Sequence, residues 1–219
     1  MTWLLVVRHA QSEWNAAGRW QGRADPPLSP AGIDQTRLAG EGLPGVLAEL
    51  GAEGPVTSLW SSDLERARET ARIIGEAVGY DQPRREVPQL GEHDVGDWSG
   101  LTHPEIEARW PGLIEAWGSG RLASTPGGEH RAAFDRRVQN GIRTVVSAAP
   151  PGIAVVVSHG GVIRSISRWL TGADGPVQHL EGVALRVGED GDIRYEDRVR
   201  LLTAAAVRPV ASEGAGQAE

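Results

Sequence analysis

The sequence contains no cysteine and no lysine, and each absence excludes whole classes of chemistry. Without cysteine the chain can form no disulfide, no thiolate zinc site and no cysteine nucleophile. All 22 cationic side chains are arginine, so a Schiff base, a pyridoxal-phosphate anchor and the lysine of a Walker-type loop are excluded as well. Any anion that this protein binds must be held by arginine, histidine, backbone amides or a metal ion.

A long hydrophobic run and an excess of basic charge are also missing. No apolar stretch approaches the roughly 18–20 residues that a membrane helix requires. The short apolar run near the N-terminus leads directly into Arg8-His9, which is not the order of a signal peptide. The net charge of −7 offers no basic footprint for nucleic acid. We therefore expect a cytoplasmic protein that binds neither nucleic acid nor membrane.

Short apolar runs predict the strands of a buried sheet. Such runs are rich in Val, Ile, Leu and Trp and lie at residues 3–7, 56–60 and 153–157. A further segment, residues 182–200, turns at residues 189–192 and predicts a hairpin at the edge of the sheet. Helical patterns separate these strands and cover residues 30–50, 64–78, 102–110, 129–148 and 160–170.

Three of the expected helices carry start signals. Ser29-Pro30 supplies an N-cap followed by a first-turn proline. Thr102 with Glu105 three residues later predicts a capping box. Residues 61–63, Ser-Ser-Asp, predict a capping cluster for the helix that follows the second strand.

The order of these elements predicts one domain. No linker or internal repeat divides the chain, so residues 1–202 are expected to form a single unit. Residues 203–219 have the composition of a disordered tail. Strands that alternate with helices predict a layered α/β domain in which at least part of the sheet is parallel.

Polar residues follow the ends of all three predicted strands. Arg8-His9 follows the first, residues 61–66 the second, and residues 158–161, Ser-His-Gly-Gly, the third. In open α/β sheets, ligands bind beyond the carboxyl ends of the strands, so these groups are expected at one rim. The glycine pair opens a helix whose free amides and dipole favour an anion.

Each of these groups has a simpler interpretation when it is taken alone. A histidine after a strand is more often a hydrogen-bonded structural residue. Arginines such as Arg66 and Arg68 commonly pair with neighbouring carboxylates on an exposed helix face. Three strand ends that each carry arginine or histidine in one α/β chain favour a functional site instead.

Four motifs resemble those of the histidine phosphatase (phosphoglycerate mutase-like) superfamily. They are RHAQSEWNAAGRWQG, SSDLERARETA, LGEHDVGDWSGLTHPEI and VVVSHGGVIR, and they occur in the order of that family. The resemblance implies a three-layer αβα sandwich with a mostly parallel central sheet. Two positions depart from the pattern. Ala10 stands where glycine is usual, so its backbone must admit a Cβ, and His130 replaces the serine of a P-G-G-E-S element.

The resemblance implies roles for individual residues. His9 is the nucleophile and becomes a phosphohistidine, while Glu92 protonates the leaving oxygen and then helps to activate water. His159 stabilises the charge of the transferred group. Arg8 and Arg66 offer forked donors to the phosphate and lower the pKa of His9 by like charge. The remaining phosphate-site positions are filled by Asn15, Gln21, Gly22 and Gly160.

This scheme requires no metal and no other cofactor. His93 and Asp94 beside Glu92 suggest metal ligands, but a third ligand at a fixed spacing is not evident. The interval between Glu92 and His159 lacks the long insertion of the mutases. The chain thus resembles the compact, broad-specificity phosphatase branch, and we expect metal-independent hydrolysis of a small phosphorylated metabolite.

Residues 98–130 are predicted to form a lid over the leaving group of the substrate. Trp98, Trp110 and Trp117 lie in this segment, and each of them can equally serve hydrophobic packing. Because loops set specificity on a shared scaffold, the substrate itself is not predicted. Whether the chain is a monomer or a homodimer is left open.

Two alternatives remain beside the phosphatase. A phosphoglycerate-mutase-type phosphotransferase would require the phosphoenzyme to survive until a second substrate binds. A non-catalytic module that only binds phosphorylated ligands is disfavoured, because all five catalytic positions are occupied by competent residues.

Overall fold

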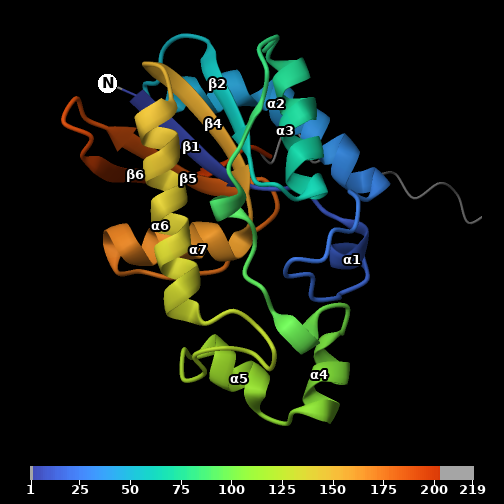
Figure 1. Cartoon of the computed structure of the whole chain (residues 1–219). Helices are drawn as coiled ribbons and strands as arrows, with labels where there is room; N and C mark the ends of the chain where they lie inside the picture. The colour runs from blue at the N-terminus through green and yellow to red at the C-terminus, as the bar shows by residue number, and fades with distance from the viewer. Residues whose placement is uncertain (1, 203–219) are drawn as a thin grey trace, which may run out of the picture.

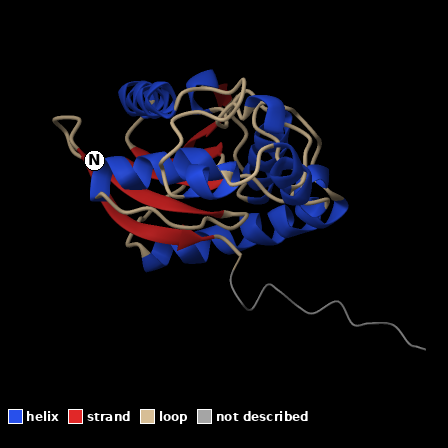
Figure 2. Ribbon diagram, turned by 90° about the horizontal axis from the view of Figure 1, so that it is seen from below, coloured by secondary structure: helices blue, strands red, loops and turns tan. Residues whose placement is uncertain are grey.

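The computed structural model describes residues 2–202. The tail predicted at residues 203–219 lies outside the described residues. One six-stranded sheet has the order β3-β2-β4-β1-β5-β6, and helices cover both of its faces (Figures 1 and 2). Its strands are β1 (Thr2–Arg8), β2 (Val56–Ser61), β3 (Arg85–Glu86), β4 (Gly152–Ser158), β5 (Glu181–Val187) and β6 (Ile193–Arg200).

The sheet is mostly parallel, with an antiparallel hairpin at one edge. The strand pairs β1–β4, β4–β2 and β2–β3 are parallel. The pairs β1–β5 and β5–β6 are antiparallel. The three predicted strands and the edge hairpin are therefore confirmed, whereas the two-residue strand β3 gives too short a pattern to be predicted.

Two hydrophobic cores hold the three layers together. Leu5 and Val7 of β1 pack toward α2 and α3, while Leu4 and Val6 pack toward α6 and α7 on the other face. Successive side chains of a strand point to opposite faces, so a strand covered on both faces must be apolar throughout. The covering helices are α2 (Pro30–Glu49), α3 (Glu65–Ala77), α6 (Arg131–Ala148) and α7 (Gly160–Thr171).

Two of the predicted helix starts are confirmed. Ser29 caps α2 by accepting a hydrogen bond from the amide of Gly32, with proline in the first turn. Thr102 and Glu105 form the capping box of α4 (His103–Arg109). Within residues 2–202, no helix is both long enough and apolar enough to cross a membrane.

The predicted capping of α3 by residues 61–63 is wrong. α3 begins after Leu64, which makes no side-chain cap. The amide of Glu65 donates instead to the carboxylate oxygens of Asp25 at 2.8 and 2.9 Å. A loop distant in the sequence thus supplies the acceptor that a local cap would have supplied, and Ser62 contacts His159.

Both departures from the family pattern are accommodated locally. His130 is the N-cap of α6, where its Nδ1 accepts a hydrogen bond from the amide of Ala132 at 3.2 Å. Among the described residues, Leu180 is the only non-glycine residue with positive φ. Ala10 therefore has a backbone that admits its Cβ, as expected, and its amide donates to the Thr70 hydroxyl at 3.2 Å.

A small cluster with its own apolar centre lies beyond the carboxyl ends of the parallel strands. α4 and α5 (Leu113–Gly118) lie below the sheet in Figure 1. Trp98 and Ile106 are fully buried in the centre of this cluster, and Trp110 and Trp117 pack around it. The other short elements are α1 (Glu13–Ala16) and the 3-10 helices η1 (Pro88–Leu90) and η2 (Gly96–Trp98).

Candidate active site

A cavity of about 500 Å³ opens where the parallel strands end. Arg8 pairs with Ser158, and Ser61 pairs with Val157, so the carboxyl ends of β1, β2 and β4 lie level with one another. Most of the predicted site residues line the cavity, namely Arg8, His9, Asn15, Gln21, Gly22, Arg66 and Glu92. The strand ends thus bring together residues that are far apart in the sequence.

His9 is held as a neutral imidazole whose Nε2 carries the lone pair. Its Nδ1 lies 2.6 Å from the carbonyl oxygen of Ala10 and must donate, because a carbonyl oxygen can only accept. Nε2 therefore keeps its lone pair, toward which Arg66 Nε donates at 3.2 Å. Burial, followed by the charges of Arg66 and Arg8, lowers the pKa of His9 well below its ordinary value.

Backbone carbonyls hold the two arginines beside His9. The fully buried Arg66 donates to the carbonyl oxygens of Ala24 and Gly22 at 2.7 and 2.9 Å. Burial lowers the pKa of Arg66 to about 10, so it remains a cation at neutral pH. Arg8 donates to the Val177 carbonyl at 2.7 Å, and none of residues 2–202 places a carboxylate within 4.0 Å of it. Arg66 also lies 3.6 Å from the Asp25 carboxylate, so Arg8 is the arginine of this pair whose positive charge is left to an anion.

Two side-chain amides complete the innermost part of the cavity. The Asn15 oxygen accepts from the amide of Ser12 at 3.2 Å and from His179 Nε2 at 3.1 Å. The Gln21 oxygen accepts from the Ser12 hydroxyl at 2.9 Å. Because protein donors already occupy both oxygens, the N–H groups of both amides are left to a ligand.

His179 is a third histidine that sequence reasoning missed. Its ring centroid lies 6.2 Å from that of His9. Burial, followed by the charge of Arg8, lowers the pKa of His179 to about 4. It stands just before β5, an antiparallel strand whose position beside β1 gave no sequence signal.

His159 lies behind His9 and does not line the cavity. The two ring centroids are 5.1 Å apart and the rings meet edge to face. His159 Nε2 lies 2.7 Å from the Ser62 hydroxyl, while its buried Nδ1 has no partner among the described residues. Burial, followed by the charge of Arg66, lowers the pKa of His159 well below its ordinary value.

Glu92 lies on the cavity wall at the start of α7. Its Oε1 accepts from the amide of His93 at 2.8 Å, and its Oε2 accepts from the amide of Gly161 at 3.2 Å. Gly161 lines the cavity and Gly160 does not. A Cβ on Gly161 would lie 2.3 Å from Glu92 Oε1, whereas the nearest atom to a Cβ on Gly160 is 3.5 Å away.

Of the other polar residues of the Glu92 segment, His93 also lines the cavity and the two aspartates do not. Asp94 and Asp97 are exposed and do not line this cavity. His93 stacks on Phe134 with ring centroids 4.4 Å apart, and its Nε2 donates to the Glu129 carbonyl at 2.8 Å. Residues 2–202 contain no group of three His, Asp or Glu side chains placed to hold a metal ion.

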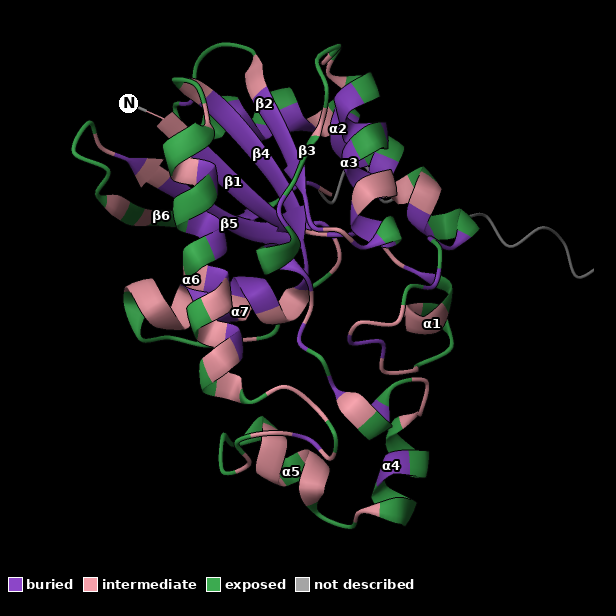
Figure 3. Cartoon of the chain, in the orientation of Figure 1, coloured by how far each residue is buried: buried purple, intermediate pink, exposed green. Residues whose placement is uncertain are grey.

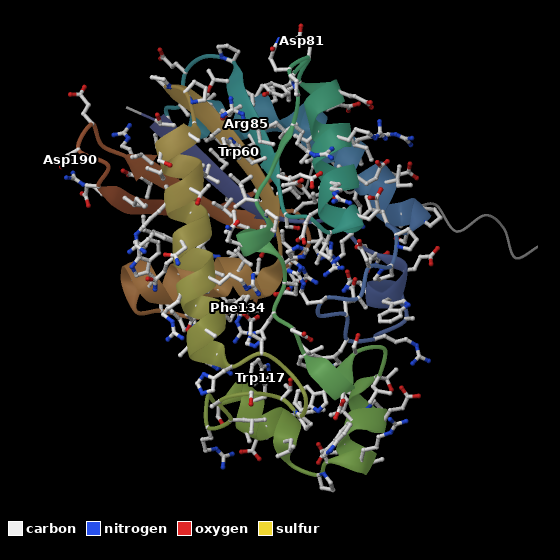
Figure 4. The ribbon with its side chains drawn as sticks, viewed as in Figure 1. Trp60, Asp81, Arg85, Trp117, Phe134 and Asp190 are labelled. Carbon is white, nitrogen blue, oxygen red and sulfur yellow. The ribbon has the colours of Figure 1, made fainter. Side chains whose placement is uncertain are left out.

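The outer part of the cavity combines aromatic and basic side chains. Trp117 of α5 and Phe134 of α6 lie on this side of the sheet (Figure 4). Four further arginines line the same region: Arg19, Arg131, Arg164 and Arg168. Arg164 and Arg168 were not predicted as site residues. The sequence offers a signal for them, because they stand four residues apart on one face of the helix that follows the Gly-Gly pair.

A neutral histidine between arginines at the strand ends of an αβα fold is suited to phosphoryl transfer. Residues 4–189 match the family model of the histidine phosphatase superfamily (branch 1). The chain is 35% identical over 176 residues to the glucosyl-3-phosphoglycerate phosphatase of Mycolicibacterium vanbaalenii, covering 77% of this chain and 74% of that protein. It is 29% identical over 222 residues to a metal-independent phosphoserine phosphatase of Arabidopsis thaliana, covering 89% and 90%.

The comparison with solved structures also finds a phosphatase. A mycobacterial glucosyl-3-phosphoglycerate phosphatase in complex with VO3 matches with a TM-score of 0.73 at 31% identity, covering 89% of this chain and 96% of that one. The chain therefore belongs to the histidine phosphatase superfamily. With phosphatases among its relatives, it is a phosphoric monoester hydrolase. The predicted αβα fold and family are thus confirmed.

Proposed function

We propose that the protein hydrolyses phosphomonoesters of small metabolites without a metal ion, in two steps that pass through a phosphohistidine on His9. The observation that carries this proposal is the hydrogen bond from His9 Nδ1 to the Ala10 carbonyl. That bond fixes the tautomer and leaves Nε2 as a nucleophile at the inner end of an arginine-lined cavity.

In the first step, His9 Nε2 forms a bond to phosphorus while the bond between phosphorus and the leaving oxygen breaks. Glu92 delivers its proton to that oxygen and becomes a carboxylate. The phosphate oxygens bind the four donors already in place, Arg8, Arg66, Asn15 and Gln21. A hydrogen bond to a charged partner typically contributes about 1.5–3 kcal/mol.

The network behind His9 supports a donor role for His159. The amide of Leu64 donates to the Ser62 hydroxyl at 3.3 Å, which leaves the hydroxyl proton for His159 Nε2. Nε2 is then an acceptor, and the proton of the ring resides on Nδ1. This buried N–H has no partner among the described residues, and we propose that a bound phosphoryl group reaches it past His9, since His159 itself does not line the cavity.

In the second step, water attacks phosphorus and the bond to Nε2 breaks, which returns the electron pair to His9. The Glu92 carboxylate takes the proton of the water, so the acid is regenerated and phosphate leaves. We also propose that residues 98–130 cover the leaving group, because Ile114, Trp117 and Gly118 of α5 line the cavity. A cytoplasmic location remains a prediction from the composition.

The proposal is tested by following p-nitrophenyl phosphate hydrolysis in excess EDTA, alongside isomerisation of 3-phosphoglycerate. We expect hydrolysis at an unchanged rate, a labelled phosphoenzyme after acid-free quenching, and no labelling of His9→Ala. The exposed His130→Ala serves as the control and keeps its label. Activity that EDTA removes and magnesium or zinc restores would refute the metal-free mechanism. Isomerisation that outpaces hydrolysis would favour the phosphotransferase.

A further inference from the structure

The segment that carries Glu92 has no regular secondary structure to hold it. Residues 91–95 lie between the 3-10 helices η1 and η2, so neither a helix nor a sheet ladder fixes their backbone. The Glu92 carboxylate depends on that backbone, because the hydrogen bonds that it accepts within residues 2–202 come from the main-chain amides of His93 and Gly161. A displacement of the segment would therefore displace the carboxylate as well.

Arg137 of α6 binds the backbone of this segment. Its Nη1 donates to the carbonyl oxygens of Gln89 and Gly91, each at 2.8 Å. Its Nη2 donates to the carbonyl oxygen of Glu92 at 3.2 Å. The Glu129 carboxylate accepts the other two hydrogen bonds, from Nε at 3.0 Å and from Nη2 at 2.7 Å. All five donors of the guanidinium are thus used, and three of them bind the backbone at or just before Glu92.

Glu129 orients Arg137 and also binds the segment itself. The two bonds from Arg137 to its carboxylate form a bidentate pair, which restrains the plane of the guanidinium. The Glu129 amide donates to the Asp94 carbonyl at 2.9 Å, and the Glu129 carbonyl accepts from His93 Nε2 at 2.8 Å. Burial raises the pKa of Glu129, but the hydrogen bonds and the charge of Arg137 outweigh burial and hold that pKa below its ordinary value. The pair therefore stays ionised at neutral pH.

Arg137 itself lies outside the cavity that His9 and Glu92 line. Its side chain lines a separate pocket together with Gln89 and Asp94. An effect of Arg137 on the reaction must therefore pass through the backbone that it binds, and that backbone carries the Glu92 carboxylate.

We propose that Arg137, paired with Glu129, is a positioning residue that holds the backbone around Glu92 so that its carboxyl group stands at the leaving oxygen. This inference rests on the proposed role of Glu92 as the proton donor. A displaced carboxyl group delivers its proton less well, and the loss is greatest for a leaving group that needs the proton. A purely structural role for Arg137 would slow all substrates alike.

The test compares phenyl phosphate with p-nitrophenyl phosphate, which share a ring and differ in the leaving oxygen. Phenolate needs a proton more than nitrophenolate does, because the nitro group spreads the negative charge. The phosphorylation step is followed in single turnover. Arg137→Met should slow phenyl phosphate by about 10-fold, part of the general-acid contribution, and p-nitrophenyl phosphate by less than about threefold. Arg137→Lys keeps the charge without the planar fork and should recover part of the loss.

Hydrogen exchange adds a measurement that does not depend on activity. The amide of His93 donates to Glu92 and should exchange faster in Arg137→Met, whereas the amide of Val155 in the central strand β4 should keep its protection. Arg136→Met is the matched control, because Arg136 is an exposed arginine of the same helix that lines neither pocket. It should change neither the two rates nor the exchange.

Equal losses for both esters in Arg137→Met, or an unchanged exchange of the His93 amide, would overturn the inference. If Arg137→Met does not fold, Glu129→Gln gives the same comparison with a smaller expected difference, because it removes the charge of the bidentate pair and leaves Arg137 in place. If the unsubstituted protein hydrolyses neither ester, the proposed function fails, and the exchange of the His93 amide alone then decides whether Arg137 holds the segment.

Discussion

The two ends of the cavity are built in different ways. At the phosphate end, His9 is 2% exposed and Arg66 is 0% exposed, and backbone carbonyls fix both of them. At the outer end, the side chain of Arg164 is 39% exposed and the carboxylate of Asp174 holds it. Figure 3 shows the same contrast between the buried strands and the largely exposed α4. Backbone partners cannot change rotamer, so the phosphate end is the rigid one.

This difference indicates that the phosphate end serves bond breaking and the outer end serves recognition of the leaving group. Bond breaking requires groups that are placed before the substrate arrives. Recognition of a leaving group tolerates side chains and short helices that can adjust, and such segments commonly set specificity on a shared scaffold. Substitutions at the phosphate end should therefore affect all substrates alike, and those at the outer end should discriminate between them.

Glu92 lies at the boundary between the two ends, and its substitution should have the largest effect. An alkyl leaving group needs a proton, whereas nitrophenolate hardly does. General acid–base assistance is typically worth about 10²–10⁴-fold, so Glu92→Gln should lose that factor on alkyl phosphates and much less on p-nitrophenyl phosphate. Single-turnover kinetics of the phosphorylation step measure the two losses separately.

Asp97→Asn is the control for Glu92→Gln, because Asp97 is an exposed carboxylate of the same segment that does not line the cavity. It should leave both rates unchanged. Equal losses on the two classes of substrate in Glu92→Gln would mean that Glu92 is not the proton donor. The boundary between the two ends would then have to be placed elsewhere.

The phosphate end was also the part that the sequence allowed us to predict. Its main groups lie at or shortly after the ends of parallel strands, and the apolar runs locate those strands without any knowledge of long-range contacts. The positions of Arg8, His9 and His159 follow from that rule alone. His179 does not, because it reaches the site through the residues just before β5, where the amide of Leu180 donates to the carbonyl of Arg8. No local sequence pattern reveals the register in which a strand pairs with an antiparallel neighbour.

The outer end depends on contacts that no periodicity encodes. Arg131 lies against Trp117, which belongs to another helix. At the phosphate end, Asp25 likewise caps α3 across forty residues of sequence. Such pairs form only when the chain is folded, which explains why the sequence predicted a lid over residues 98–130 but not its contact with α6.

A second, smaller effect is expected from the glycine pair that opens α7. A Cβ on Gly161 would lie 2.3 Å from Glu92 Oε1 and would have to displace that carboxylate, while a Cβ on Gly160 has 3.5 Å of room. Gly161→Ala should therefore slow the hydrolysis of alkyl phosphates by about 10-fold, part of the general-acid contribution. Gly160→Ala should slow it less. Steady-state kcat/KM on both variants decides between the two glycines, and a greater loss in Gly160→Ala would contradict the placement of Glu92 against Gly161.

The last effect concerns stability, and it follows from the burial of the histidines at the phosphate end. The pKa values of His9 and His159 lie well below their ordinary value, and that of His179 is about 4. Between these values and an unfolded-state pKa of about 6.5, the unfolded chain binds more protons than the folded protein. The free energy of unfolding must therefore fall as the pH drops below about 6.5, by at most about 1.4 kcal/mol per pH unit for each histidine.

Urea unfolding at about pH 7.5 and about pH 5.5 measures this loss, in a range above the usual titration of Asp and Glu. His179→Gln should make the loss smaller, because one buried neutral imidazole is removed. His103→Gln is the matched control from the outer end, where His103 is exposed and lines the same cavity. It should leave the pH dependence as it is. If the unsubstituted protein is equally stable at both pH values, the histidines beside His9 are not held neutral, and the contrast between the two ends of the cavity would lose its electrostatic basis.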